Sequence, residues 1–280
     1  TRKESSAASD VYKRQIRISL AYVIMIILIW IPMARRKSLA FLDVGQGDCF
    51  VADTKSGAII FDGGSSSEDQ VGRYRILPYM KYLGYQKIQI AVISHMDIDH
   101  YSGIKELLEM GKIKYLGLPE IPKDETMKKI IGIAKKRGTT IFYLSRGRQI
   151  TTKDGSLKVL HPQKNSQMEK NAASLVMQGK ILGYRVLLTG DVEKEGEEEL
   201  LSEELERADI LKAAHHGSKN STSNEFLQKV QPKQTVISCG KQNRYGHPHL
   251  ETIHRLQTYR TKIYRTDRSG AIIFFKRRDG

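Results

Sequence analysis

Ser94-His95-Met96-Asp97-Ile98-Asp99-His100-Tyr101-Ser102-Gly103 follows a run of strand-forming residues, 88–93. A strand presents alternate side chains to one face, so a strand that ends here in a tight turn aims His95, Asp97 and Asp99 at a common point. His100 arrives as the chain turns into a helix. The alternative without a functional site is a polar turn that contains two histidines. The buried-type strand before the stretch and the small Ser-Gly helix start after it favour a metal site instead, and the geometry suits two metal ions better than one.

Composition limits the classes of protein to which the chain can belong. With 280 residues, 40% hydrophobic and 28% charged, it is globular in type and long enough for one large or two small domains. Cys49 and Cys239 lie far apart in the sequence and form no C-x-x-C pattern, so neither a disulfide framework nor a cysteine-type zinc site is indicated. Any metal is therefore expected on nitrogen and oxygen. The net charge of +15 favours a polyanionic partner, either nucleic acid or an anionic membrane surface, with a solvated basic surface as the alternative.

The N-terminal region divides into two segments. Residues 1–15 are polar and small and show no apolar periodicity, so they are expected to be disordered or to belong to no fold. Residues 18–33 carry no charge, and with Ile16 and a snorkelling Arg17 they approach the ~20 residues that span a bilayer. A signal-peptide core is the competing interpretation, but the run is long for one and 34–37 is a poor cleavage site. We expect a transmembrane helix over 16–34. Basic residues flank it on both sides, so its orientation and the membrane side of the following domain stay open.

From residue 38 the pattern changes to short strands separated by turns and helices. Gly-rich turns separate the first three strands, and helices alternate with strands thereafter. The pattern then repeats in kind after about residue 175. Two such halves predict an α+β domain over 38–280 in which two sheets pack together with helices outside. The predicted strands are 38–44, 49–53, 58–61, 88–94, 113–116, 139–144, two within 148–160, 175–177, 185–188, 210–213, 234–238, 262–264 and 271–275; the predicted helices are 68–83, 104–111, 125–137, 193–205, 224–230 and 250–259.

Other polar clusters also fall at predicted strand ends. Asp191 follows the strand 185–188 after Thr189-Gly190. Its carboxylate could bridge two cations or serve as the N-cap of the next helix. His215 and His216 follow the strand 210–213. Adjacent histidines usually point to opposite faces, so we expect at most one at the metal centre and the other on substrate; a satisfied surface pair is the alternative. His247 lies in the loop 244–249, which is a weak signal alone, and Asn171 suits a turn or a helix cap.

The motifs in this order resemble a known family. The opening stretch is similar to the H-x-[HD]-x-D-H signature of the metallo-β-lactamase fold, and five further motifs resemble one branch of it. That branch is the C-terminal domain of the ComEC family of competence DNA-uptake channel proteins, and the resemblance covers 38–280. The five motifs are Leu42-Asp43-Val44-Gly45-Gln46-Gly47-Asp48, Asn171-x-x-Ser174-Leu175-Val176, Thr189-Gly190-Asp191, His215-His216-Gly217-Ser218 and Asn243-Arg244-Tyr245-Gly246-His247-Pro248.

The resemblance implies a fold and a set of ligands. The fold is a four-layer αββα sandwich with its metal site at the sheet edges. The resemblance assigns His95 and Asp97 to one divalent metal ion, Asp99, His100 and His247 to a second, and Asp191 to a bridge between them. Asn171 stands where many relatives have a third histidine, which weakens the first site and leaves Asn171 as a ligand of metal or substrate. Carboxylate-rich ligands suit manganese as well as zinc.

The implied chemistry is phosphodiester hydrolysis on DNA. Two metal ions activate water and stabilise the leaving oxygen. Asp99 belongs to this catalytic set, and His215 or His216 stabilises the phosphorane charge or protonates the leaving group. Lys219, Lys241 and Arg244 are expected to hold the phosphate backbone, with ordinary solvated side chains as the alternative.

Other functions stay open beside a membrane-tethered nuclease of DNA uptake. One is a catalytically weak metal- or DNA-binding domain of an uptake channel, which Asn171 favours. Another is a hydrolase of small anionic esters on the same fold. One helix forms no DNA channel, so we expect either the tail of a longer channel protein or a stand-alone chain that works with a separate pore subunit at the cell membrane.

Overall fold

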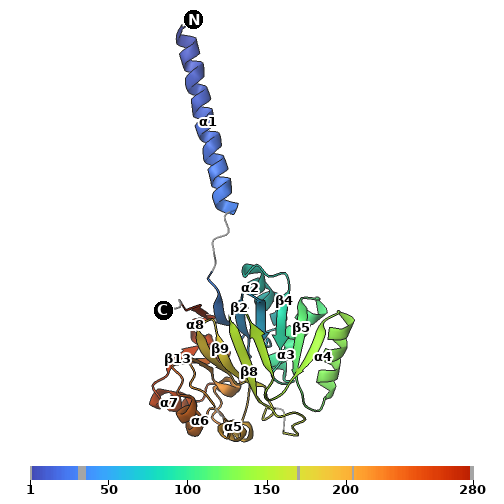
Figure 1. Ribbon diagram of the computed structural model, residues 1–280. Helices are drawn as coiled ribbons and strands as arrows, with labels where there is room; N and C mark the ends of the chain where they lie inside the picture. The colour runs from blue at the N-terminus through green and yellow to red at the C-terminus, as the bar shows by residue number, and fades with distance from the viewer. Residues whose placement is uncertain (1, 31–35, 169–170, 204, 278–280) are drawn as a thin grey trace. The chain divides into compact units, whose positions relative to one another are not determined.

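The computed structural model describes residues 2–30, 36–168, 171–203 and 205–277. The chain divides into two compact units, Thr1–Arg36 and Lys37–Gly280. The first unit holds the single helix α1 (Arg2–Trp30), drawn in blue in Figure 1.

Helix α1 begins earlier than the sequence predicted. Residues 2–15, which were expected to lack regular structure, are helical as far as the apolar segment. Alanine, lysine, arginine and glutamate occur throughout this part, and all have high helix propensity. Among the residues that the structure describes, no helix is both long and apolar enough to cross a membrane. The expected transmembrane helix over 16–34, of which 31–34 lie outside the described residues, stays a prediction.

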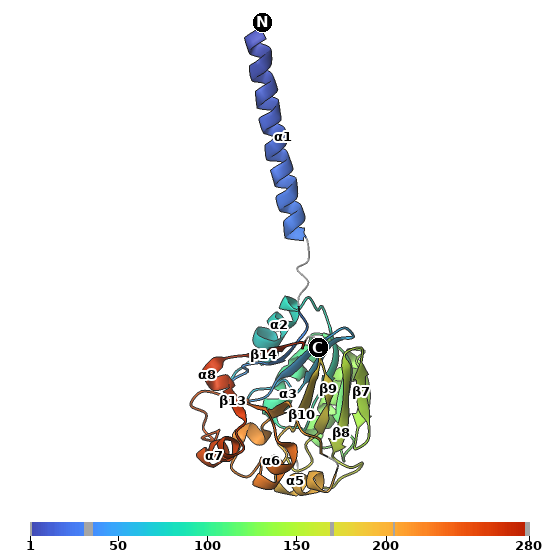
Figure 2. The same ribbon diagram turned by 60° about the vertical axis from the view of Figure 1, so that its left-hand side comes forward.

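The second unit is built on two sheets, as the sequence predicted, and each sheet has seven strands. The first sheet has the order β14-β1-β2-β3-β4-β5-β6 and the second β13-β12-β11-β10-β9-β8-β7; β7, β8 and β9 lie side by side in Figure 2. The strands are β1 (Ser38–Phe41), β2 (Phe50–Thr54), β3 (Gly57–Phe61), β4 (Ile88–Val92), β5 (Ile113–Pro119), β6 (Thr140–Leu144), β7 (Gln149–Thr152), β8 (Gly155–His161), β9 (Val176–Ile181), β10 (Tyr184–Leu188), β11 (Ile210–Lys212), β12 (Gln234–Ile237), β13 (Lys262–Arg265) and β14 (Ile272–Phe275).

Helices cover the outer face of each sheet. Three apolar clusters define the layers: one under η1 and α2–α4, one between the sheets, and one under α5–α7. Figure 1 shows α4 on one flank of this unit and α6 and α7 on the other. The helical segments are η1 (Gly72–Ile76), α2 (Leu77–Tyr82), α3 (Ile98–Glu109), α4 (Glu125–Lys136), α5 (Lys194–Leu201), η2 (Ala214–Gly217), α6 (Asn224–Val230), α7 (Leu250–Thr258) and α8 (Thr266–Ser269).

The parallel strands place loops of both sheets at corresponding edges. Strands β3 to β6 pair in parallel in the first sheet, and β10 to β13 do so in the second. The carboxyl ends of parallel strands lie at one edge of a sheet, which is where α/β folds carry ligands. The loops that follow β3, β4, β10, β11 and β12 contain most of the polar residues singled out in the sequence.

Candidate metal centre

Four buried side chains converge at this edge. Asp48, His100, Asp191 and His216 each offer one potential ligand atom, and these atoms lie within 4.8 Å of one another. The Asp191 Oδ2 atom is 3.2 Å from His100 Nε2 and 3.3 Å from His216 Nε2. The Asp99 Oδ2 atom lies 3.4 Å from His216 Nε2. Aspartate 191 therefore stands at the centre of the group, between α3 and the turn after β11.

Close backbone packing holds Asp48 beside helix α3. The Asp48 amide donates to the Asp99 carbonyl at 3.0 Å, and the Gly64 amide donates to the Asp48 carbonyl at 3.1 Å. A Cβ atom on Gly64 would lie 2.6 Å from the Asp99 carbonyl carbon, closer than real Cβ contacts. Only glycine fits at this crossing, so Gly64 keeps the loop of Asp48 within reach of the helix start.

The histidines of the centre are oriented through their Nδ1 atoms. His100 Nδ1 lies 3.0 Å from Asp62 Oδ2, His216 Nδ1 is 2.9 Å from the Ser238 carbonyl, and His95 Nδ1 is 3.0 Å from Ser94 Oγ. In the part of the chain that the structure describes, the buried Nε2 atoms of these three histidines accept and donate no hydrogen bond. An Nδ1–H donated to a neighbouring oxygen leaves the Nε2 lone pair to a metal. The residues present therefore fit a divalent cation.

The charges of the centre also favour a cation. Burial lowers the pKa of His216, but the carboxylates of Asp191 and Asp48 outweigh burial and raise it to about 10. Burial raises the pKa of Asp99, yet the imidazole of His216 beside it and the charge of His100 lower it to about 2. The raised pKa of His216 marks a negative potential at its ring, whereas the lowered pKa of Asp99 marks the positive charge of the neighbouring imidazoles. A divalent metal ion bound to neutral imidazoles would neutralise the same carboxylates that the imidazolium protons neutralise without metal.

Lys212 supplies a permanent positive charge at the back of the site. Its side chain is almost fully buried, and its Nζ atom contacts Asp48 Oδ2, lies 3.4 Å from Asp191 Oδ1 and donates to the Gly190 carbonyl at 3.0 Å. One oxygen of Asp191 thus faces the lysine and the other faces the histidines. Lys212 fixes the orientation of this carboxylate.

The predicted first metal pair lies next to this group. His95 Nε2 is 3.6 Å from Asp97 Oδ2, and the rings of His95 and His100 have centroids 4.1 Å apart. The Asn171 side-chain amide donates to Glu193 Oε1 at 3.4 Å, and the same oxygen is 2.9 Å from His215 Nδ1. Asn171 therefore contacts the partner of a candidate catalytic histidine.

His215 and His216 do not alternate as in a strand. Both adopt left-handed backbone angles, with φ of 47° and 52°, in the turn η2. Their Nε2 atoms lie 3.9 Å and 3.3 Å from Asp191 Oδ2, so both rings approach the same carboxylate. Only His216 belongs to the group of four. The expectation of opposite faces assumed an extended backbone, but the chain is extended only as far as Ala213 and then enters the turn η2.

His247 lines the pocket in front of the centre. This pocket has a volume of about 250 Å³ and is lined by Gln46, Asp97, Ile98, Asp99, Asp191, His215, His216, Tyr245 and His247. The ring centroid of His247 is 5.4 Å from that of His215 and 6.2 Å from that of His216. Burial and the charges of His216 and His215 lower its pKa to about 4, so the ring is neutral at pH 7. His247 is outside the group of four, and its role as a ligand stays a prediction.

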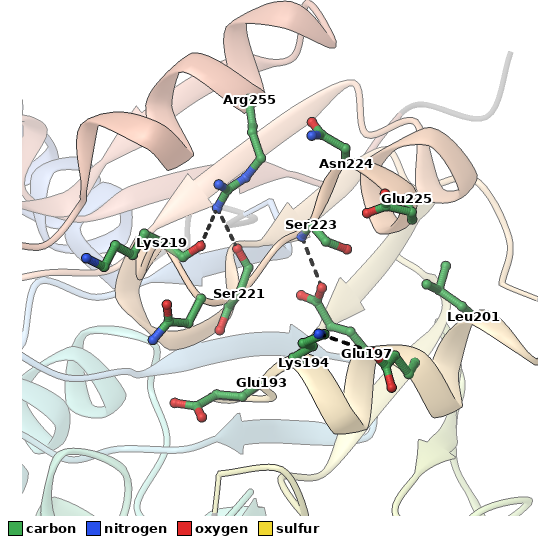
Figure 3. A pocket seen from close by; sticks show the side chains of 12 residues that line it. Glu193, Lys194, Glu197, Leu201, Lys219, Ser221, Ser223, Asn224, Glu225 and Arg255 are labelled. Atoms are coloured by element: carbon green, nitrogen blue, oxygen red, sulfur yellow. Dashed lines mark hydrogen bonds and ion pairs between the residues drawn. The ribbon is translucent and has the colours of Figure 1, made fainter.

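The three predicted phosphate-binding cations divide between two places. Lys241 and Arg244 are exposed on the loop that carries Tyr245 and His247 into the pocket. Lys219 instead lines a second pocket of about 690 Å³ between α5 and α6 (Figure 3). Arg255 reaches across this pocket to the carbonyls of Lys219 and Ser221, at 3.1 Å and 2.9 Å. The charged residues that line it are Glu193, Lys194, Glu197, Glu198, Lys219, Glu225 and Arg255, an excess of acid that disfavours a phosphate backbone.

Sequence reasoning assigned no ligand or catalytic role to Asp48, Asp62, Lys212 or Glu193. Asp48 follows a glycine-rich turn shortly before β2 begins, and Asp62 directly follows β3, so their position at a strand end was the available signal. Lys212 lies in an apolar strand and is buried. Lysine is rarely buried, so a lysine at the end of such a strand was the available signal.

The chain belongs to the metallo-beta-lactamase superfamily, whose family model matches residues 42–241. Within this superfamily, the chain is similar to competence proteins. It is 35% identical to ComE operon protein 3 of Bacillus subtilis over 92% of this chain and 35% of the relative. It is 30% identical to competence protein ComA of Neisseria gonorrhoeae over 85% of this chain and 32% of that protein. The resemblance to competence proteins is thus confirmed, and the chain spans about a third of the length of these relatives.

A solved structure agrees on the fold. The metallo-beta-lactamase fold protein YhfI of Bacillus subtilis superposes with a TM-score of 0.57 over 84% of this chain and 99% of YhfI. The two sequences are 12% identical, so the likeness concerns the fold alone.

Proposed function

We propose that the domain 38–280 is a metal-dependent phosphodiesterase that cleaves DNA during competence-related DNA uptake. The observation that carries the proposal is the buried group of Asp48, His100, Asp191 and His216, whose histidine Nε2 atoms point at a shared carboxylate. The superfamily and the competence relatives support the reaction class and its setting.

The residues of the centre would hold one or two divalent metal ions. One or two divalent ions, zinc or manganese, would supply an activated water and neutralise phosphate charge. His100, His216, Asp99 and Asp191 would hold the tighter ion, and His95 with Asp97 would hold a weaker one. His247, neutral at pH 7, borders the pocket as a further nitrogen donor.

His215 is the proposed proton donor to the leaving oxygen. Its Nδ1 atom is 2.9 Å from Glu193 Oε1, and its ring lines the pocket. A carboxylate beside one ring nitrogen can orient the imidazole, and a ring held in this way within the pocket is the arrangement that general acid catalysis needs.

The substrate strand is proposed to pass over the loop of Lys241 and Arg244. Both cations are exposed beside the metal pocket, whereas Lys219 faces the acidic pocket of Figure 3. The net charge of +15 supports a polyanionic substrate.

The domain is further proposed to work at the cell membrane. Residues 16–34 would form the anchor, which the exposed apolar side chains of Leu20, Ile24 and Ile27 support. The similarity to competence proteins supports action beside a DNA-uptake channel, either within a longer protein or with a separate channel subunit. The side of the membrane on which the domain lies stays open.

A nuclease assay tests the proposed reaction. Labelled single- and double-stranded DNA is incubated with the protein and added manganese or zinc. The Asp99→Ala and Asp191→Ala variants should cleave at least about 100-fold more slowly than the parent, because each loses a carboxylate of the centre. Asp69→Ala, an exposed aspartate outside the centre, is the matched control and should cleave like the parent.

The alternative is a catalytically weak domain that binds DNA or metal. The contact of Asn171 with Glu193, where many relatives carry a histidine ligand, favours it. DNA that stays intact with the parent and with both variants, while all three bind it, would establish this alternative. Cleavage of small phosphate esters with DNA left intact would instead establish a hydrolase of small anionic esters.

A further inference from the structure

Two large apolar side chains are exposed at the mouth of the metal pocket. Ile98 begins helix α3 and is 54% exposed, and Tyr245 lies in the loop after β12 and is 43% exposed. Both line the pocket, whose other lining residues are polar or charged. A phosphate group alone needs neither an aromatic ring nor an isoleucine in contact with solvent.

The loop holds the Tyr245 ring in a defined position. The Asn243 side chain donates to the carbonyls of Gly240 and His247, at 3.0 Å and 2.6 Å, and accepts from the His247 amide at 2.9 Å. The Tyr245 ring stacks on His247, with centroids 5.6 Å apart and planes at 21°. Because these contacts fix the loop around the ring, little conformational entropy is lost when a ligand packs on it.

A flat cation already lies over this ring. The Arg244 guanidinium carbon is 4.8 Å from the ring centroid, and its Nη2 atom lies 2.6 Å from the Tyr245 hydroxyl oxygen. Arg244 is exposed, so an incoming planar group can take its place. The guanidinium released in this way would then be free to pair with a phosphate.

We propose that Tyr245 is a stacking platform for a nucleobase of single-stranded DNA next to the scissile phosphodiester, with Ile98 as the apolar contact from α3. The inference rests on the proposed function and names its substrate as a single strand. Bases stack on exposed aromatic rings when they are unpaired, whereas in a duplex their faces are covered by neighbouring bases.

Equilibrium binding without catalysis tests the platform. Fluorescence anisotropy is measured with chelator present, on a labelled single-stranded DNA and on an oligonucleotide of the same length whose residues are all abasic. In Tyr245→Ala, the Kd for DNA should rise about tenfold, because one base loses its stacking partner. The Kd for the abasic strand should be the same for variant and parent.

Two further variants separate stacking from other effects. Tyr245→Phe keeps the ring and should bind DNA within about twofold of the parent, because base stacking needs the ring and not the hydroxyl. Tyr74→Ala removes an exposed tyrosine outside the pocket and should bind like the parent. Equal DNA affinity of Tyr245→Ala and parent would overturn the proposal, as would an equal loss on both strands. A parent that binds DNA through Tyr245 but cleaves none would instead overturn the proposed hydrolysis and leave the platform standing.

Discussion

Lys212 is the residue that most changes the account of the metal centre. It places an ammonium group between Asp48 and Asp191, and burial lowers its pKa less than these two carboxylates raise it. Two carboxylates at this depth without a cation would repel each other strongly. Lys212 therefore stabilises the centre even when no metal is bound.

Replacement of this lysine tests its role. Lys212→Met should lower the free energy of unfolding of the metal-free protein by about 3–5 kcal/mol, because it removes the buried ammonium group that pairs with Asp48 and Asp191. Urea unfolding with chelator present measures the loss, and added divalent metal should restore part of it.

An exposed ion pair provides the matched control. Lys128 lies 2.8 Å from Glu125 on α4, and both side chains are mostly exposed. Lys128→Met should cost less than about 1 kcal/mol. Equal losses of unfolding free energy in the two variants would show that Lys212 stabilises the protein no more than an exposed ion pair does.

Among the site residues, the sequence revealed those that form a contiguous motif. His95, Asp97, Asp99 and His100 follow one strand, so their proximity could be predicted from local geometry. The contacts of Asp48 and Lys212 arise only when loops of two sheets meet, and no local pattern specifies that pairing. The left-handed turn at His215 and His216 was equally inaccessible, because neither residue is glycine.

Helix α5 shows how an element beside the centre is held. Buried Glu197 accepts hydrogen bonds from the amides of Thr222 and Ser223, just before α6 begins. Figure 3 shows the bond from Ser223. Burial raises the pKa of this carboxyl against the effect of those amides, which lower it. The side chain thus connects α5 to the loop that follows His216.

Removal of this connection should loosen the α5–α6 region. Glu197→Ala leaves two backbone donors without their acceptor, at a cost of about 1–3 kcal/mol each where they stay buried. We expect a corresponding loss in urea unfolding and faster hydrogen exchange at Thr222 and Ser223.

The neighbouring Glu198 is the control on the same helix. Its side chain is largely exposed, so Glu198→Ala should change stability by less than about 0.5 kcal/mol. Unchanged exchange at Thr222 in Glu197→Ala would contradict the connection.

Element types were more predictable than element ends. Helix α6 begins and ends where expected. Ser223 caps its first turn, and the left-handed Gln231 follows its last residue. The acidic helix expected over 193–205 is shorter, at Lys194–Leu201, and the helix expected over 68–83 divides into η1 and α2. Tertiary contacts decide such ends, for example when Arg146 pairs with Glu199 and Glu203 near the end of α5.

For the whole molecule, alternation of short strands and helices was sufficient to predict two sheets with helices outside. The order of strands within each sheet was not predictable, because β14 pairs with β1 across nearly the whole sequence of the domain. That pairing completes the first sheet. The metal centre then forms from loops of both sheets.

We propose that His100, Asp191 and His216 hold a divalent metal ion. Calorimetric titration of the metal-free protein with manganese or zinc tests it most directly. The parent should bind at least one ion per chain, and His216→Ala should bind at least about 100-fold more weakly, because it loses the Nε2 atom that faces Asp191. His254→Ala, an exposed histidine on α7, should bind like the parent. A parent without saturable binding, or a His216→Ala variant that binds as tightly as the parent, would contradict the account.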